Sequence, residues 1–399
     1  MKKIAFVLPA DLPVPAIKGG AIETLVEDFI LENEIKKKFE IVVFSVYNQQ
    51  AKKLSIDYKY TKFVYFKFNE VYKVLNLPIR IIRKVFKIKI EDLRIIILQL
   101  QLKKNNFDKV IIQGLINHLP PIAKVITQDR IIIHLHADII KPENKKWLDI
   151  LSNFSGKIVV VSSFIKNRIV ENLKIDSDQI IVIKNCVSEN FSNFKDLSFV
   201  GKEKSRFGIT NDDFVILFIG RIVEDKGIQH LIKAVYKLKD TVNIKLIVVG
   251  SFGSAFGNGE TIDNFAKETL ELADLTDGKV FFTGYVKSSL KRAYFNLADI
   301  IVVPSLCNEA APLVPIEGMA CGLPIITTTQ GGIPEYVTAE CGILIDVDEF
   351  FVENLKKAIL KLYNNKELRI KMGEKGKELA KQYTPTVFYN DYLKLIGEN

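Results

Sequence analysis

The sequence predicts an α/β protein made of two doubly wound, Rossmann-like domains, each with a mostly parallel β-sheet that helices cover on both faces. The length of 399 residues suits two domains of ordinary size. Short apolar runs alternate with longer helical patterns through both halves of the chain. Several of these runs are followed at once by glycine, histidine or basic residues, which is where α/β folds place their ligands.

Composition and cysteine content narrow the class of protein. Hydrophobic residues make up 48% of the chain and charged residues 26%, as in globular proteins with large cores. No apolar run approaches the roughly 18 residues of a transmembrane helix. The run Ile4–Leu8 favours a first strand over a signal peptide, because no small-x-small cleavage site follows it. The four cysteines are widely spaced without a Cys-x-x-Cys pair, so we expect neither a zinc site nor disulfides, and a cytoplasmic location.

Positive charge is concentrated in one segment. The net charge is +9, and residues 51–104 hold 14 Lys and Arg against 4 Asp and Glu. Such a segment suits nucleic acid, an anionic membrane surface or an acidic acceptor. No nucleic-acid-binding motif accompanies it, so we expect no nucleic acid partner. Attachment to the inner face of a membrane and a plain solvated basic face remain open.

The first half begins as a strand–turn–helix unit. After Ile4–Leu8 and a proline-containing loop, Gly19 and Gly20 precede a helical pattern over 21–38. Glycines at a helix entrance let a ligand phosphate approach the backbone, although a tight turn needs them equally. A long helical pattern over 78–104 fits either a core helix with a wet edge or an interfacial surface. Further strands are predicted at 40–46, 62–66, 108–112, 130–135, 158–161 and 180–183.

Three of the four histidines follow strands of this first half. His118 comes after the strand 108–112, and His134 and His136 end the strand 130–135, with Asp138 close behind. A His-x-His pair on a strand shares one face and suits a metal, but no third ligand appears at a matching spacing. A ligand-binding pair and hydrogen-bonded structural histidines are both compatible with this pattern.

After a polar segment at 185–200, which predicts an interdomain linker, the second half alternates again. The Gly-rich loop 250–259 lacks a dinucleotide fingerprint and favours a flexible connection. Asp346 and Asp348 end a strand before a helix, so we do not expect them to bind metal. Strands are predicted at 214–219, 245–249, 280–282, 300–303, 323–326 and 343–345, and helices at 227–239, 260–273, 287–296, 353–362, 366–382 and 386–396.

Two glutamates flank the start of a short predicted helix. Glu309 precedes this helix and Glu317 lies in its first turns, with Gly322 at its end. Free N–H groups near Leu313 and Val314, together with the positive end of the helix dipole, suit a phosphate. Carboxylates on either side suit the hydroxyls of a ribose and a sugar. The alternative is a solvated loop residue and a glutamate that complements the helix dipole.

A second stretch supplies positive charge. The segment 214–227 predicts a buried strand, a turn carrying Arg221, and Lys226 at the entrance of another helix. Two fixed cations at the end of a strand neighbouring the glutamates would neutralise a diphosphate.

Together these stretches resemble the retaining glycosyltransferases of family 4, which have the two-domain GT-B fold. The matching segments are Glu309-x7-Glu317, Gly220-Arg221 with Lys226-Gly227, Phe-x-Gly-Tyr-Val at 282–286 and Gly-Gly-Ile-Pro-Glu at 331–335. The chain departs from the family at Ala310-Ala311-Pro312, where members often carry a Pro-Phe-Gly-like run.

The resemblance implies two domains facing across a cleft: an acceptor-binding domain at 1–195, a donor-binding domain at 196–380, and a C-terminal helix at 381–399 that crosses back to the first. Catalytic roles would fall to His136, Arg221, Lys226 and Glu309, and tentative acceptor contacts to His118, His134 and Asp138. In the donor site Glu317 would hold the ribose and Glu309 the sugar hydroxyls. The implied donor-binding residues are Gly19, Gly20, Arg221, Lys226, Tyr285, Val286, Glu309, Leu313, Val314 and Glu317.

The implied activity is metal-independent transfer of a hexose-type sugar, with retention, from a nucleoside diphosphate sugar to an acceptor hydroxyl. A UDP-sugar is the favoured donor, and a glycan or lipid-linked acceptor in cell-surface or spore-coat polysaccharide synthesis is the expected partner. No cofactor is expected, since the nucleotide sugar is a substrate. Two other hypotheses remain: a nucleotide-sugar 2-epimerase of the same fold, and a non-catalytic nucleotide-sugar-binding protein.

Overall fold

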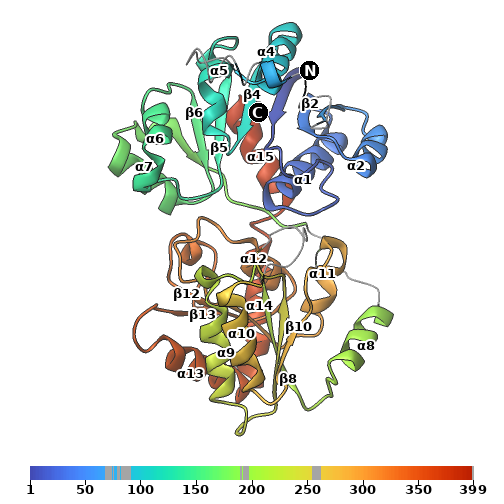
Figure 1. The fold of residues 1–399 in the computed structure, drawn as a ribbon, viewed down its shortest axis with the longest axis vertical. Helices are drawn as coiled ribbons and strands as arrows, with labels where there is room; N and C mark the ends of the chain where they lie inside the picture. The colour runs from blue at the N-terminus through green and yellow to red at the C-terminus, as the bar shows by residue number, and fades with distance from the viewer. Residues whose placement is uncertain are drawn as a thin grey trace. The chain divides into compact units, whose positions relative to one another are not determined.

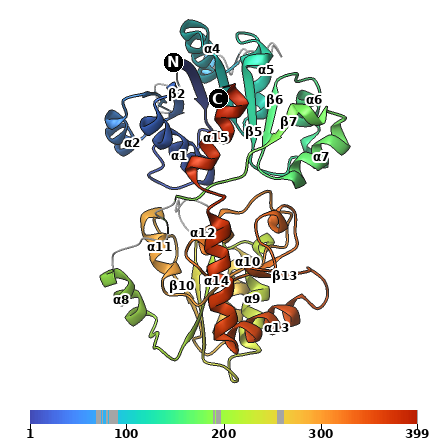
Figure 2. The ribbon, with the colours of Figure 1, turned by 180° about the vertical axis from the view of Figure 1, so that it is seen from behind.

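A computed structural model describes residues 1–67, 91–188, 197–253 and 262–397, together with residues 74, 76–78, 81 and 191. Its contacts divide the chain into two compact units (Figures 1 and 2). Unit 1 is Met1–Lys184 with Pro385–Asn399, and unit 2 is Asn185–Thr384. Each unit is an α/β domain with one parallel sheet, as predicted.

The sheet of unit 1 has the strand order β3-β2-β1-β4-β5-β6-β7, and neighbouring strands run parallel. The order reverses between β1 and β4, which makes this the point where doubly wound sheets bind ligands. The strands are β1 (Lys2–Val7), β2 (Phe39–Val46), β3 (Thr61–Phe66), β4 (Lys109–Gln113), β5 (Ile131–Leu135), β6 (Lys157–Val160) and β7 (Ile180–Val182). The described helices are α1 (Ala21–Lys36), α2 (Gln49–Leu54), α4 (Leu93–Asn105), α5 (Leu119–Ala123), α6 (Lys145–Ser152), α7 (Ser163–Leu173) and α15 (Pro385–Ile396).

The last helix of the chain, α15, completes the core of unit 1. It lies beside α1, as both views show (Figures 1 and 2). The ring of Phe29 on α1 is 4.7 Å from that of Tyr389 and 5.4 Å from that of Tyr392. The Tyr389 hydroxyl also donates to Oδ1 of Asn33 at 2.9 Å. Aromatic burial therefore fixes α15 to unit 1 although it is remote in sequence.

The sheet of unit 2 has the order β10-β9-β8-β11-β12-β13, again parallel, with its reversal between β8 and β11. Alternate residues of β8 pack into two different core clusters, so helices cover both faces. The strands are β8 (Phe214–Ile219), β9 (Ile244–Val249), β10 (Val280–Phe282), β11 (Ile300–Val303), β12 (Ile325–Thr328) and β13 (Gly342–Ile345). The described helices are α8 (Leu197–Arg206), α9 (Ile228–Tyr236), α10 (Asn264–Asp274), α11 (Ser288–Phe295), α12 (Leu313–Ala320), α13 (Phe351–Tyr363) and α14 (Lys366–Ala380).

Two predictions about elements need correction. The helix predicted over 78–104 is not continuous, because α4 starts at Leu93, where the Asp92 side chain accepts from the Ile95 amide and caps it. Residues 82–90 of that pattern lie outside the described residues. The predicted linker 185–200 is also partly structured, since α8 begins at Leu197.

The domain boundary in the contacts lies at Lys184, earlier than the predicted 195. Asn185 donates its side-chain amide to the Ala311 carbonyl at 2.9 Å, and the Val187 amide donates to the Tyr383 carbonyl at 2.8 Å. These hydrogen bonds tie the start of the predicted linker to unit 2. None of the helices in the described ranges combines the length and the apolar character needed to cross a bilayer.

Candidate functional site

In unit 2 the loops after β8, β11 and β12 meet at the carboxyl end of the sheet. Gly227 has φ 68°, and a Cβ there would lie 2.0 Å from the Pro304 carbonyl oxygen. Gly331 has φ 63°, and a Cβ there would lie 2.4 Å from the Glu309 carbonyl oxygen, which also accepts from the Gly332 amide at 2.7 Å. Only glycine fits such contacts, so the Lys-Gly and Gly-Gly segments place the Glu309 loop.

Lys226 and Glu309 form an ion pair in this site. The same carboxylate oxygen accepts from the hydroxyl of the buried Ser305 at 2.8 Å. The side chains of Lys226 and Glu309 are 22% and 16% exposed, so both remain partly open to a ligand. The charged ends of the two motif residues are thus fixed in position by each other.

Glu317 on α12 is paired with Lys291 on α11. Its side chain is only 7% exposed. One carboxylate oxygen contacts the lysine, and the other, Oε2, is buried without a hydrogen-bond partner among the described residues. A buried acceptor of this kind is costly unless a donor reaches it, and a ligand hydroxyl would satisfy it.

The start of α12 lies between the two glutamates in sequence. Pro312 precedes the helix, and no side chain caps it. The amides of Leu313 and Val314 are therefore in the first turn, where N–H groups have no partner within the helix. The site thus has a helix end that suits an anion and two carboxylates that are able to accept from ligand hydroxyls.

Arg221 borders an open hollow of about 530 Å³. Its side chain is exposed, and the hollow is also lined by Val223, Glu224, Asp225, Leu306 and Cys307. Burial raises the pKa of the Cys307 thiol, and the charges of Glu309 and Lys226 also act on it. Tyr285 is 40% exposed, whereas Val286 packs against the core of unit 2.

The corresponding point of unit 1 contains the predicted glycines and histidines. Gly19 and Gly20 have φ values of 75° and 99°, and Gly20 is the residue before α1. The carboxylate of the buried Glu23 occupies the space beside Gly20, because a Cβ there would lie 2.2 Å from its Oε2. Burial, with a smaller contribution from Asp11, raises the pKa of Glu23 to about 7.

His134 lies on β5 and His136 directly follows it, with ring centroids 4.0 Å apart. Nε2 of His136 is 2.6 Å from Oε1 of Gln113 on β4, and Nδ1 of His134 is 2.7 Å from the Tyr392 hydroxyl on α15. Burial lowers the pKa of both histidines, so both rings are neutral near pH 7. His134 is completely buried, which leaves it a supporting position rather than a direct contact with an acceptor.

The other two residues predicted to contact the acceptor are Asp138, which has protein partners, and His118, which is half-buried. Asp138 forms an ion pair with Arg168 at 2.9 Å and accepts from the Ile140 amide at 3.0 Å, so it organises the turn after β5. Burial and the nearby Arg94 lower the pKa of His118 to about 4. An acceptor role for these two residues stays a prediction.

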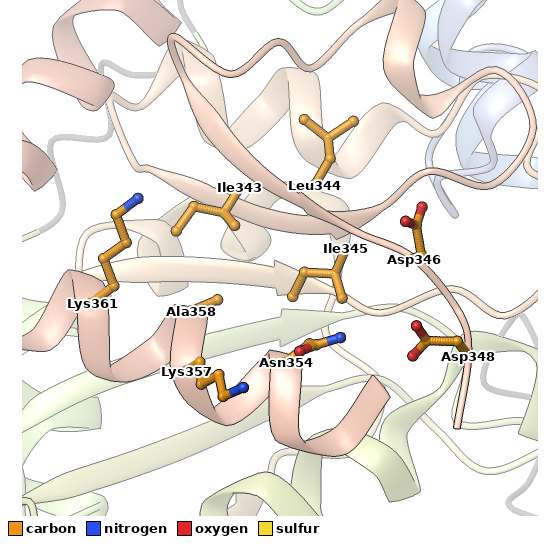
Figure 3. Close-up of a pocket in the computed structure, with 9 residues that line it drawn as sticks. All are labelled: Ile343, Leu344, Ile345, Asp346, Asp348, Asn354, Lys357, Ala358 and Lys361. Carbon is orange, nitrogen blue, oxygen red and sulfur yellow. The ribbon is translucent and has the colours of Figure 1, made fainter. Parts of the chain in front are cut away.

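A separate hollow contains the Asp-x-Asp pair. Figure 3 shows Asp346 and Asp348 on the segment after β13, with Lys357 and Lys361 on the nearby helix α13. Asp346 accepts from the Thr329 hydroxyl at 2.7 Å, and Asp348 accepts from the Phe350 amide at 2.9 Å. Both carboxylates therefore have structural partners. Within the described ranges, His, Cys, Asp and Glu do not gather in groups of three that could hold a metal.

Of the predicted residues of unit 2, Lys226 and Glu309 are paired, and Arg221 borders the hollow that includes Leu306 and Cys307 from the loop before Glu309. Their roles in binding stay predictions.

The sequence motifs did not indicate the residues that hold these groups. In unit 2 those residues are Lys291, which pairs with Glu317, and Ser305, which donates to Glu309. In unit 1 the motifs likewise did not indicate Gln113, Tyr392 and Glu23, which lie against His136, His134 and Gly20. A charge count finds Lys291 only as one of many lysines.

The chain is similar in sequence to known glycosyltransferases. Residues 200–379 match the family model described as Glycosyl transferases group 1. The chain is 34% identical over 232 residues to an uncharacterized glycosyltransferase, MJ1178, of Methanocaldococcus jannaschii, covering 58% of this chain and 56% of the relative. It is 24% identical over 384 residues to the putative glycosyltransferase YtcC of Bacillus subtilis, covering 94% and 87%. The chain spans about half the length of the first relatives it matches, 56% and 47%.

Solved structures show the same architecture. A glycosyltransferase from Rickettsia africae superposes with a TM-score of 0.76 at 21% identity, covering 99% of this chain and 97% of the other. Anabaena HepE in complex with UDP and glucose superposes with a TM-score of 0.77 at 18% identity, covering both chains completely. The predicted GT-B fold is confirmed by these likenesses.

Proposed function

We propose that this protein is a retaining glycosyltransferase of family 4 that uses a nucleoside diphosphate sugar, with a UDP-sugar as the first donor to test. The observation that carries the proposal is the state of Glu317. Its buried Oε2 has no hydrogen-bond partner among the described residues, and no side chain caps the start of the same helix, which suits an anion. A nucleoside diphosphate offers both complements, because its ribose donates hydroxyls and its phosphates are anionic.

Arg221 and Lys226 serve the leaving group. In the reaction the anomeric carbon–oxygen bond to the diphosphate breaks, and a bond to the acceptor oxygen forms on the same face. The acceptor proton passes to the departing diphosphate oxygen. Negative charge grows on the diphosphate in the transition state, so fixed cations and the amides of Leu313 and Val314 stabilise it. These cations also support a reaction without a metal, which EDTA treatment followed by an activity assay tests.

Glu309 binds hydroxyls of the donor sugar in this proposal. Its ion pair with Lys226 and its hydrogen bond from Ser305 hold it before substrate arrives. Preorganised groups of this kind lose little entropy in the transition state. By the resemblance alone, Tyr285 and Val286 are assigned to the base, Gly19, Gly20 and His136 to the donor sugar, and His118 and Asp138 to the acceptor.

The names of relatives suggest the acceptor class. They include a capsular polysaccharide biosynthesis glycosyltransferase of Staphylococcus aureus and a spore coat protein of Bacillus subtilis. We therefore propose an acceptor hydroxyl in a cell-surface polysaccharide or its lipid-linked precursor.

We also propose that the basic segment 51–104 attaches the protein to the inner face of an anionic membrane. Exposed apolar side chains occur within this segment, including Ile56 at 77% and Leu100 at 63% exposure. Basic residues with exposed apolar groups favour such a surface. Co-sedimentation with vesicles containing phosphatidylglycerol, and none with phosphatidylcholine alone, is the expected result. Failure to sediment with either kind of vesicle, or equal sedimentation with both, would contradict this part of the proposal.

Thermal stabilisation by a panel of nucleoside diphosphates and their sugar conjugates tests the donor site. A ligand at 100 times its dissociation constant adds about 2.7 kcal/mol to the free energy of unfolding. We expect one diphosphate to raise the melting temperature and its sugar conjugate to raise it further. A melting temperature unchanged by every nucleotide at millimolar concentration contradicts the proposed function.

A further inference from the structure

We propose that Gln113 and Tyr392 are positioning residues that fix His136 in one neutral tautomer, with the proton on Nε2 and a lone pair on Nδ1 for a substrate hydroxyl. The tautomer is a property of the free protein. The identity of that hydroxyl, on a sugar substrate, rests on the proposed function.

A chain of neutral polar groups supports this inference. Gln113 and His134 are register partners on the adjacent strands β4 and β5, and His136 follows on the same face. Gln113 is 1% exposed, and His134 and Tyr392 are fully buried. His136 is only partly buried, so it is the member of this group that a ligand can reach. The Gln113, His134 and Tyr392 side chains are thus held where water does not compete.

The direction of each hydrogen bond follows from the Gln113 amide. Its carbonyl oxygen lies 2.6 Å from Nε2 of His136, and a carbonyl oxygen only accepts, so Nε2 carries the proton. The neutral imidazole then has its lone pair on Nδ1.

The nitrogen of the Gln113 side-chain amide also makes a hydrogen bond. Gln113 hydrogen-bonds the Tyr392 phenol and partly offsets the burial that raises the pKa of that phenol. The amide nitrogen is the donor in this contact, so Tyr392 gives its own proton to Nδ1 of His134 at 2.7 Å. With both ends of the amide engaged, its orientation is fixed. Tyr392 on helix α15, near the C-terminus of the chain, therefore helps to set the protonation of His136, the residue after β5.

This arrangement gives His136 a defined task. A neutral ring with a free Nδ1 accepts from a hydroxyl and orients it, whereas a protonated ring would donate and repel the cationic transition state of a sugar. Such outer partners fix ring orientation and tautomer at many histidine sites.

Ring-labelled ¹⁵N histidine and long-range ¹H–¹⁵N spectra at pH 7.5 test the tautomer. The chain has four histidines, so each signal is assigned by a single His→Gln variant. We expect the wild-type His136 signals of a protonated Nε2 and an unprotonated Nδ1. Gln113→Met removes the acceptor at similar volume, and we expect it to convert those signals to averaged ones. Gln113→Glu keeps an acceptor oxygen and should preserve the tautomer.

Gln99→Met is the matched control, because Gln99 donates to the Pro121 carbonyl in the same unit and has no part in this chain of groups. A proton on Nδ1 of His136, or spectra that Gln113→Met leaves unchanged in a folded protein, would overturn the inference. If Gln113→Met does not fold, Tyr392→Phe decides, since it frees one end of the amide and should broaden the His136 signals. Unchanged signals in a folded Tyr392→Phe protein would then overturn the inference.

The spectra need no substrate, so failure of sugar transfer and failure of this inference are separate results. Once a donor is known, Gln113→Met should lower kcat/KM about tenfold, with Gln113→Glu closer to wild type, as loss of one oriented hydrogen bond predicts.

Discussion

Lys226 and Lys291 each hold one glutamate of the motif pair in unit 2. A buried or half-buried carboxylate is tolerated when a cation and hydrogen bonds compensate it. Each Lys–Glu pair has no net charge. Arg221 adds a positive charge beside them. The side chains of the proposed donor site are therefore held in position without a ligand.

At the residue scale, we expect Arg221→Ala and Lys226→Ala each to lower turnover by at least ~10²-fold, because each removes charge that stabilises the leaving diphosphate. Steady-state kinetics with the donor identified by the nucleotide panel measures this. Lys233→Ala, an exposed lysine on α9, is the control and should keep wild-type turnover. Near-normal turnover of either site variant would remove its role.

Lys291→Met should destabilise the protein by about 1–3 kcal/mol, since it leaves the buried Glu317 carboxylate without its donor. Urea unfolding measures the change. Glu317→Gln in the same chain should recover most of the loss, because the double variant has no unpaired charge. Additive losses in the double variant would show that the two side chains do not interact.

The residues of the candidate site in unit 2 were only partly predictable from the sequence. Glu309, Glu317, Arg221 and Lys226 were predicted because their spacing places them at strand ends and at a helix start. Lys291 was not predicted, because its partner lies on another helix and no sequence pattern distinguishes it from other lysines. The tertiary fold brings these two side chains together, and sequence spacing does not encode that contact.

At the scale of elements, glycines set the positions of the loops that carry the site. Gly331→Ala should displace the Glu309 loop, because its Cβ would lie 2.4 Å from the Glu309 carbonyl oxygen and its φ is 63°. We expect at least about tenfold weaker nucleotide binding by calorimetry, as strain of 1–3 kcal/mol implies. Gly201→Ala meets no atom within 4 Å and should bind normally. Equal affinities for the two variants would show that the loop tolerates the change.

At the start of α1, ionisation of the buried Glu23 destabilises the folded protein. Burial raises the pKa of Glu23 from 4.5 to about 7, so its stabilising effect is full below pH 4.5 and is lost as the pH rises through 7. Glu23→Gln should therefore be more stable than wild type at pH 8, by up to about 3 kcal/mol, and similar at pH 4.5.

Urea unfolding at both pH values, with Glu32→Gln in the same helix as control, measures the effect. A Glu23→Gln protein that is no more stable than wild type at pH 8 contradicts the assignment.

Most strands were predicted within a residue or two, because apolar runs of a parallel sheet are distinctive. The helix start within 78–104 was not predicted. Apolar residues occur throughout this segment, so the N-cap at Asp92 does not stand out in the sequence. The linker was misjudged for a related reason: Asn185 looks like a loop residue, yet its hydrogen bond to Ala311 joins it to unit 2.

At the scale of the whole molecule, the two units have the same kind of sheet topology. Each has a parallel sheet whose order reverses once, and each gathers its polar residues at the carboxyl ends of the strands beside that reversal. Alternating apolar and helical patterns made this fold predictable. The docking of α15 on unit 1 depends on the aromatic contacts of Phe29, which are long-range and invisible to local patterns.

The most direct test of the account is proton NMR of the wild-type protein with the donor that the nucleotide panel identifies. Slow hydrolysis, with water as the acceptor, should release the nucleoside diphosphate and a sugar that first appears in the anomeric configuration of the donor. A donor that stays intact at high protein concentration, or a sugar released first in the opposite configuration, would contradict retaining transfer.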